Sequence, residues 1–198
     1  SSAASDVYKR QPVCFVFHYL NAWNEGKQVT FDAIDFAVAP NFPDPDGNLP
    51  GHTEAQGRLT RWQLDVGTGR IDRELLVDVS AEFPRIDDRL AMCRHQHGFL
   101  ATASQRQRGD GGLFHEIAHI DLASGQQQVW DAGFGSGVSE PVFVERSKQA
   151  DEGAGWLLAT VYEPERHTSL LVVLDAMAVA DGRGPKLVIP RSARGTVS

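Results

Sequence analysis

The sequence predicts an all-β protein made of repeated four-stranded units, the architecture of a β-propeller. Three observations support this prediction. The apolar segments are short and alternating or β-branched, and no window holds a 3.6-residue apolar stripe for more than two turns. Turns that contain Asp and Gly recur at a nearly constant interval. A Glu placed before a Pro-containing strand start recurs at almost the same interval.

The expected strands follow from local pattern. Residues Val13–Phe17 form a β-branched and aromatic run, whereas Arg61–Asp65, Phe114–Leu122 and part of Leu170–Leu174 alternate. Residues Asp175–Asp181 can form a short helical turn at most. Nineteen glycines and ten prolines suit a chain that turns often.

The repeat length is about 55 residues. Turn-forming aspartates stand at Asp65, Asp121 and Asp175, which gives steps of 56 and 54 residues, and Glu82 and Glu140 are 58 apart. Asp can bond the turn backbone and Gly can take the left-handed position, so each of these sites favours a hairpin. Four short strands with their turns fill ~40–50 residues, the size of one propeller blade. The alternative is a β-sandwich whose hairpins are similar by chance.

The composition excludes several partners. The net charge is −7 and no long basic run is present, which argues against nucleic acid. No apolar run approaches the ~20 residues of a membrane span. Cys14 and Cys93 stand beside apolar residues, so we expect two buried free thiols and no disulfide or cysteine-based metal site. We therefore expect a cytoplasmic protein.

His18 is the strongest candidate metal ligand among the seven histidines. It ends an intensely apolar strand, where each ring nitrogen needs a partner, although a purely structural histidine would fit the same context. Glu82 and Glu140 stand among Phe, Pro and Val, where a carboxylate is costly unless it accepts a strong hydrogen bond. The ring N–H of a metal-bound imidazole is such a donor. Buried carboxylates at equivalent places in successive blades would surround a propeller axis.

The other histidines predict no metal site. His115 and His119 are four apart, but on a strand that spacing separates them by ~13 Å. His95 and His97 share a face, where a solvated or packed pair is the simpler interpretation. The remaining two, His52 and His167, are expected on surface loops.

Five segments in series resemble the carotenoid cleavage oxygenase family, which includes the lignostilbene dioxygenases and the retinal pigment epithelial membrane proteins. They are Phe15–Trp23, Leu59–Asp65, Glu82–Asp87, Gly133–Val144 and Trp156–Tyr162. The resemblance runs in order over roughly residues 13–190. It implies a seven-bladed β-propeller with Fe(II) on its axis, of which about three blades are present here.

The resemblance also implies roles for particular residues. Four histidines bind the iron in this family, and three glutamates hold three of their rings. His18 matches the third ligand, in the segment that reads Phe-His-x-x-Asn-Ala. Glu82 matches the glutamate that supports it, and Glu140 the glutamate that supports the fourth histidine. The first two ligands would lie before residue 1, and Val197 stands where the fourth is expected.

The implied reaction is the use of O2 to cleave a conjugated carbon–carbon double bond into two carbonyls. The implied substrate is a small apolar carotenoid, apocarotenoid or stilbene, and membrane-surface association of the full enzyme stays open. The 198-residue chain is expected to be an inactive fragment. Two alternatives remain: a non-catalytic propeller that serves as a binding module, and a hydrolytic propeller with calcium on Asp, Asn and Glu.

The chain ends carry separate expectations. Residues 1–11 begin with Ser1 and show no periodicity, which suggests an artefactual leader. Residues 12–190 form the partial propeller. Residues 191–198 depart from the family pattern and suggest a truncated or frameshifted tail.

Overall fold

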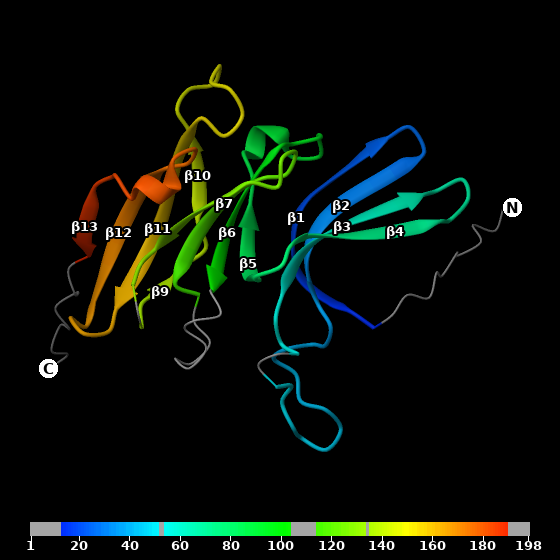
Figure 1. Cartoon of the computed structure of the whole chain (residues 1–198), viewed down its shortest axis with the longest axis horizontal. Helices are drawn as coiled ribbons and strands as arrows, with labels where there is room; N and C mark the ends of the chain where they lie inside the picture. Colours follow the sequence, from blue (N-terminus) through cyan, green and yellow to red (C-terminus); the bar gives the residue numbers. More distant parts are fainter. Residues whose placement is uncertain (1–12, 52–53, 104–113, 134, 190–198) are drawn as a thin grey trace, which may run out of the picture.

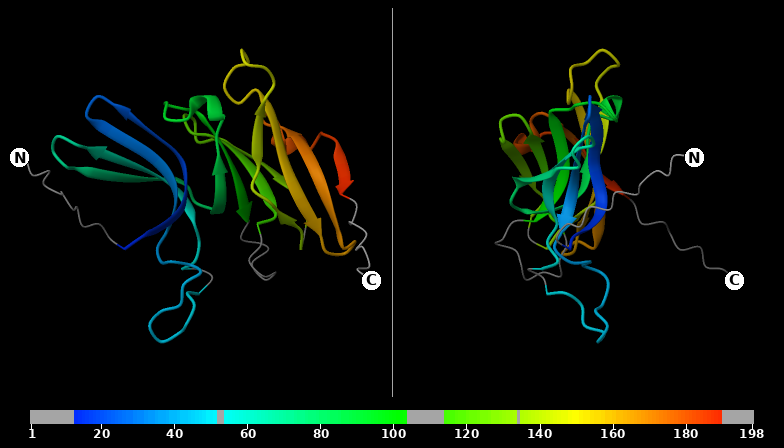
Figure 2. Two further views of the ribbon diagram at one scale, coloured as in Figure 1. Left: turned by 180° about the vertical axis from the view of Figure 1, so that it is seen from behind. Right: turned by 90° about the vertical axis from the view of Figure 1, so that its right-hand side faces the viewer.

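The computed structural model describes residues 13–51, 54–103, 114–133 and 135–189. The expected leader at 1–11, the expected tail at 191–198 and His52 lie outside these residues. Three antiparallel sheets stand side by side along the long axis of the molecule, as Figures 1 and 2 show. The prediction of an all-β fold with about three propeller blades is confirmed.

Each sheet is built on a four-stranded antiparallel meander, and the third sheet has a fifth, short strand. The first contains β1 (Phe15–Glu25), β2 (Gln28–Phe36), β3 (Arg58–Asp65) and β4 (Ile71–Val77). The second contains β5 (Ser80–Arg85), β6 (His97–Ala103), β7 (Glu116–Asp121) and β8 (Gln127–Asp131). The third contains β10 (Val142–Glu145), β11 (Gly155–Glu163), β12 (Thr168–Asp175) and β13 (Lys186–Ile189), with the short β9 (Gly137–Val138) paired to β11. Two short 3₁₀ turns, η1 (Asp88–Leu90) and η3 (Val179–Asp181), complete the described elements.

The repeated aspartates form the same turn in the first two sheets. Oδ1 of Asp65 accepts the backbone N–H groups of Gly67 and Thr68. In the same way, Oδ1 of Asp121 accepts the backbone N–H groups of Ala123 and Ser124. Glycine closes each loop with positive φ, at +72° and +74° respectively. The sequence repeat therefore records a structural repeat.

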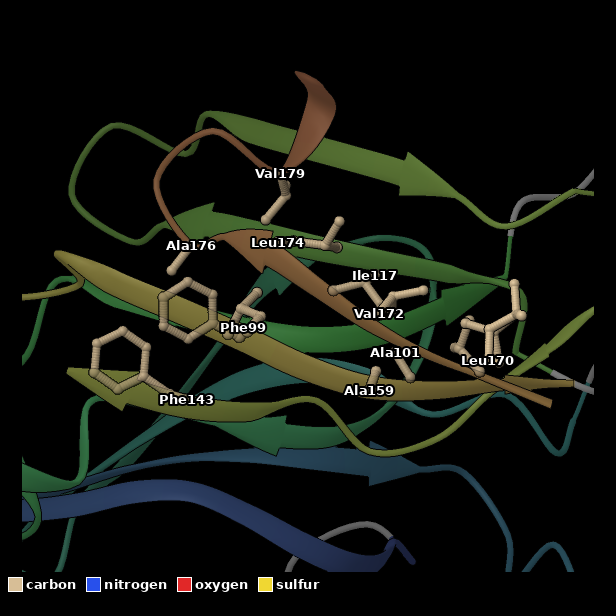
Figure 3. Close-up of a cluster of buried hydrophobic side chains, with 13 residues drawn as sticks. Phe99, Ala101, Ile117, Phe143, Ala159, Leu170, Val172, Leu174, Ala176 and Val179 are labelled. Atoms are coloured by element: carbon tan, nitrogen blue, oxygen red, sulfur yellow. The ribbon is translucent and has the colours of Figure 1, made fainter. Parts of the chain in front are cut away.

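Two hydrophobic cores fill the spaces between neighbouring sheets. The second sheet contributes to both, because alternate residues of a strand point to opposite faces. Phe99, Ala101 and Ile117 pack against the third sheet, where Phe143 and Leu157 face them (Figure 3). Leu100, Ala118 and Ile120 pack against Ile34 and Leu59 of the first sheet, on the other side.

Two local expectations are wrong. His18 does not end a strand: β1 continues to Glu25, because the residues beyond His18 pair with β2. Cys93 is exposed and Cys14 is half-buried, so neither is a fully buried thiol. Within the described residues, no helix is long and apolar enough to span a membrane.

Candidate metal centre

His18 and Glu82 form a direct contact between the first and second sheets. Nδ1 of His18, on β1, lies 2.6 Å from Oε2 of Glu82, on β5, although the two residues are 64 apart in sequence. The same oxygen accepts the backbone N–H of Phe83 at 2.5 Å. The sequence prediction that these two residues meet is consistent with this geometry.

The contact fixes which nitrogen of His18 is available. Nδ1–H donates a hydrogen bond to the carboxylate, so Nε2 of the neutral imidazole keeps its lone pair. The His18 side chain is 50% exposed, whereas that of Glu82 is only 7% exposed. An imidazole whose Nδ1–H is held by a buried carboxylate and whose Nε2 is free is the usual form of a metal-binding histidine. The expectation that His18 is buried is wrong, because its neighbours Phe17 and Tyr19 are exposed as well.

The backbone of β5 directs the Glu82 carboxylate. The pairing of β5 with β6 changes register between Glu82 and Arg85, and Phe83 has a φ of +53°. This left-handed conformation is uncommon for a bulky residue and is found mostly where the surrounding structure requires it. The bulge directs the Glu82 carboxylate toward β1 and places the backbone N–H of Phe83 against Oε2. The other oxygen, Oε1, is buried with no hydrogen-bond partner among the described residues.

Glu140 occupies the equivalent position in the third sheet but a different environment. It precedes β10 and is exposed, so the expectation of a buried carboxylate is wrong there. Its Oε1 lies 3.2 Å from Nη1 of Arg85, on β5. The ion pair links β5 of the second sheet to the segment that precedes β10 of the third, and it stabilises the Glu140 carboxylate without burial.

The remaining histidines take separate roles. His95 is buried against Asn21 and Asp32, and it does not contact His97. His97 instead contacts His119, with Nδ1 and Nε2 3.1 Å apart. Burial beside a second imidazole lowers the pKa of His119 from 6.5 to about 4.

The last two described histidines also stand alone. The His115 ring lies 3.5 Å from Glu116, and within the described residues its side chain forms no hydrogen bond with His119. His167 is exposed at a hairpin tip, as predicted. No group of three His, Cys, Asp or Glu side chains in the described part of the chain is placed to hold a metal ion. Within the described residues, His18 therefore offers one free ring nitrogen without further ligands beside it.

A cleft of about 410 Å³ lies elsewhere on the seam between the first two sheets. Its walls include Trp23, Arg61, Arg94, His95 and Glu152, and neither His18 nor Glu82 lines it. Trp23 is five residues beyond His18 on β1, which corresponds to ~16 Å along the strand. The cleft is thus distinct from the His18–Glu82 pair.

Sequence reasoning missed the polar network beside this cleft. Asn21 and Asp32 are both buried, at 9% and 0% exposure. The available signal was an amide and a carboxylate at inward positions of apolar strands. Such residues persist in a core only when they are paired.

Known proteins resemble this chain over nearly its whole length. The model of the family described as retinal pigment epithelial membrane protein matches residues 2–185. Isoeugenol monooxygenase of Pseudomonas putida is 34% identical over 91% of this chain and 40% of its own. Lignostilbene-alpha,beta-dioxygenase isozyme III of Sphingomonas paucimobilis is 32% identical over 88% of this chain and 38% of its own.

Solved structures agree. Pseudomonas brassicacearum lignostilbene dioxygenase superposes with a TM-score of 0.81 at 31% identity, over 89% of this chain and 39% of that one. Cobalt-substituted Synechocystis ACO gives a TM-score of 0.77 at 26% identity, over 88% and 36%. The chain spans about 40% of the length of the curated relatives named above. Because the family match covers nearly all of it, the chain belongs to the retinal pigment epithelial membrane protein family, that of the carotenoid oxygenases.

Proposed function

We propose that the protein containing this chain is a non-haem Fe(II) dioxygenase that cleaves a conjugated carbon–carbon double bond. The observation that carries the proposal is the His18–Glu82 contact, which leaves Nε2 of His18 free to bind a metal. Family membership supports it, since relatives are named lignostilbene dioxygenase and apocarotenoid oxygenase. Cobalt substitution in one solved relative supports a metal in that protein.

The chain's own residues fit an iron site as far as they extend. His18 would bind the metal through Nε2, and Glu82 would hold the ring without acting as an acid or base. Glu140 would support a further histidine, once its ion pair with Arg85 is exchanged for an imidazole N–H. Iron held by neutral imidazoles would supply the activation of O2.

The reaction balances without another reductant. The substrate double bond breaks, and each of its two carbons takes one oxygen atom of O2 to become a carbonyl. The substrate would be a stilbene, a carotenoid or an apocarotenoid. The relatives named for isoeugenol, lignostilbene and resveratrol are 31–34% identical to this chain, and each of those compounds has a double bond conjugated to an aromatic ring. We therefore favour an aryl-conjugated alkene.

Metal analysis tests the proposal. In the complete protein, Glu82→Gln should lower iron affinity by roughly 10- to 100-fold, because the amide no longer fixes the tautomer and basicity of His18. His18→Ala should lower it further. Glu165→Gln and His167→Ala are matched controls, since both residues are exposed. The 198-residue chain alone should not hold iron one to one, because one imidazole is too few ligands.

Two results would oppose the proposal. One is a complete protein that takes up no iron under anaerobic reconstitution. The other is iron binding that His18→Ala leaves unchanged. Incubation of the complete protein with a hydroxystilbene and with an apocarotenal, each under O2, separates the two substrate classes by their aldehyde products.

A further inference from the structure

The Asn21 side chain hydrogen-bonds the first sheet to residues 86–96, the loop between β5 and β6 of the second sheet. Its Nδ2 donates to the carbonyl oxygens of Leu90 and Cys93 at 3.1 and 2.9 Å, and also lies 3.2 Å from Nδ1 of His95. Its Oδ1 accepts the backbone N–H of Met92 at 3.0 Å. One buried side chain on β1 thus binds four residues of a single loop in the neighbouring sheet.

His95, in the same loop, contacts two residues of the first sheet, Asn21 and Asp32. Its Nδ1 lies beside the Asn21 amide, and its buried Nε2 lies 3.5 Å from Oδ2 of Asp32 without a hydrogen-bond partner among the described residues. Asp32 in turn accepts two hydrogen bonds from Arg61, both 2.8 Å long. The His95 ring packs edge-on against Trp23 at 5.2 Å. Asn21 and His95 therefore join the loop to the first sheet, and the side chains of Asn21, Asp32 and His95 are buried.

Regular backbone pairing with β2 does not hold β1 in position near His18. The pairing of β1 with β2 is irregular between Val16 and Tyr19, and again between Tyr19 and Asn21. A strand that lacks a regular ladder needs other contacts to set the direction of its side chains. Asn21 lies three residues beyond His18, about 10 Å along the strand. After the packed side chain of Leu20, it is the position at which β1 hydrogen-bonds the second sheet.

We propose that Asn21 and His95 are positioning residues that set β1 against the second sheet and so keep Nδ1 of His18 within hydrogen-bond reach of Glu82. A metal-binding consequence rests on the function proposed above. The positioning itself does not, because the His18–Glu82 bond forms without metal.

The same loop offers a matched control at the opposite seam. Arg89 donates to the Asp87 carboxylate and to the carbonyl oxygens of Ser147, Lys148 and Ala150, which precede β11 of the third sheet. Arg89→Lys removes the planar fork that makes these bonds. The substitution should destabilise the packing between the second and third sheets without changing the contacts of Asn21.

The test observes the His18 ring by ¹⁵N NMR in the metal-free 198-residue chain at alkaline pH. The parent chain should hold His18 mainly as the Nδ1–H tautomer. Asn21→Ala and His95→Leu should shift it toward the Nε2–H form and lose protection of the Met92 amide from hydrogen exchange. His95→Gln, whose amide can accept from Asn21 and donate to Asp32, should restore the parent tautomer. Asn24→Ala, at an exposed position of the same strand, should change nothing.

An unchanged His18 tautomer in a folded Asn21→Ala or His95→Leu chain would overturn the proposal. So would an equal tautomer shift in Arg89→Lys at a similar loss of stability, since that result would reflect general loosening. If Asn21→Ala does not fold, the comparison of His95→Leu with His95→Gln decides. A complete protein without iron would defeat the proposed function alone, and this readout would still stand.

Discussion

At the scale of single residues, the tertiary environment gives the histidines different hydrogen-bond partners and different exposure. His18 is half exposed and bonded to a carboxylate, whereas His119 is 3% exposed and bonded to another imidazole. Nδ1 of His119 has no hydrogen-bond partner among the described residues. A charged imidazole in that position would lose its hydration and face a second ring, so His119 stays neutral well below its usual pKa.

Acid should therefore destabilise the protein through His119. Its pKa is about 4 when folded and about 6.5 when unfolded, so below pH 6.5 the unfolded chain binds the proton first. Stability is unaffected by this group above pH 6.5 and falls as the pH drops toward 4. Between pH 7 and pH 5 the loss attributable to His119 should be about 2 kcal/mol.

Urea unfolding of the parent chain and of His119→Gln at both pH values measures this loss. Glutamine does not titrate, so the variant should lose less stability between the two pH values. His167→Gln, at an exposed site, should behave like the parent. Equal acid sensitivity in all three chains would contradict the assignment.

At the scale of elements, the first strand of each sheet is irregular where a candidate side chain stands. The pairing of β1 shifts on both sides of Tyr19, next to His18, and that of β5 shifts just after Glu82. In the third sheet the first strand is divided into β9 and β10, and Glu140 lies between them. Bulges re-aim side chains out of the regular alternation, so these breaks direct all three residues.

The pairing of β10 with β11 depends on a glycine. A Cβ at Gly155 would lie 2.3 Å from the carbonyl oxygen of Val144 and 2.7 Å from the Phe143 ring. Because Gly155 is buried and the nearest atom belongs to the backbone, Gly155→Ala should force the strands apart and cost about 2–4 kcal/mol.

Thermal unfolding compares this variant with Gly51→Ala. At Gly51 the nearest atom to a new Cβ is the end of the flexible Glu54 side chain at 3.7 Å, so the change should stay within about 0.5 kcal/mol. A Gly155→Ala chain as stable as the Gly51→Ala chain would show that the strands adapt without loss of pairing.

At the scale of the whole molecule, the third sheet has one packed face and one open face. Leu157, Val161 and Val172 are buried against the second sheet. The strand register places Val142, Val144, Trp156, Leu158 and Tyr162 together on the other face, and four of these five residues are exposed. Apolar patches of this kind drive association in water.

The 198-residue chain should therefore self-associate at micromolar concentration. Val142→Lys combined with Val144→Lys places two charges on the open face and should shift the sedimentation profile toward monomer. Val66→Lys, at an exposed turn position, is the control and should not alter the profile. A parent chain that sediments as a monomer would contradict this expectation.

Local pattern was enough to predict most of the strands and the repeat. Alternation of apolar residues and Asp-Gly turns are properties of a few neighbouring residues, so Arg61–Asp65 and the turns at Asp65 and Asp121 appear in the structure as expected. Strand ends and burial were predicted less well. β1 continues past His18 because it pairs with β2, and Glu140 is exposed and forms an ion pair with Arg85 of another sheet.

The sequence by itself determined the fold class, the repeat and the family, and it singled out His18 with Glu82. These depend on periodicity, turn chemistry and motifs in series. Only the tertiary structure decided which nitrogen of His18 is free, that Asn21 and His95 join the first two sheets, and that His97 pairs with His119. Each of those contacts joins residues 22 to 74 positions apart, and such distances close only when the sheets pack together.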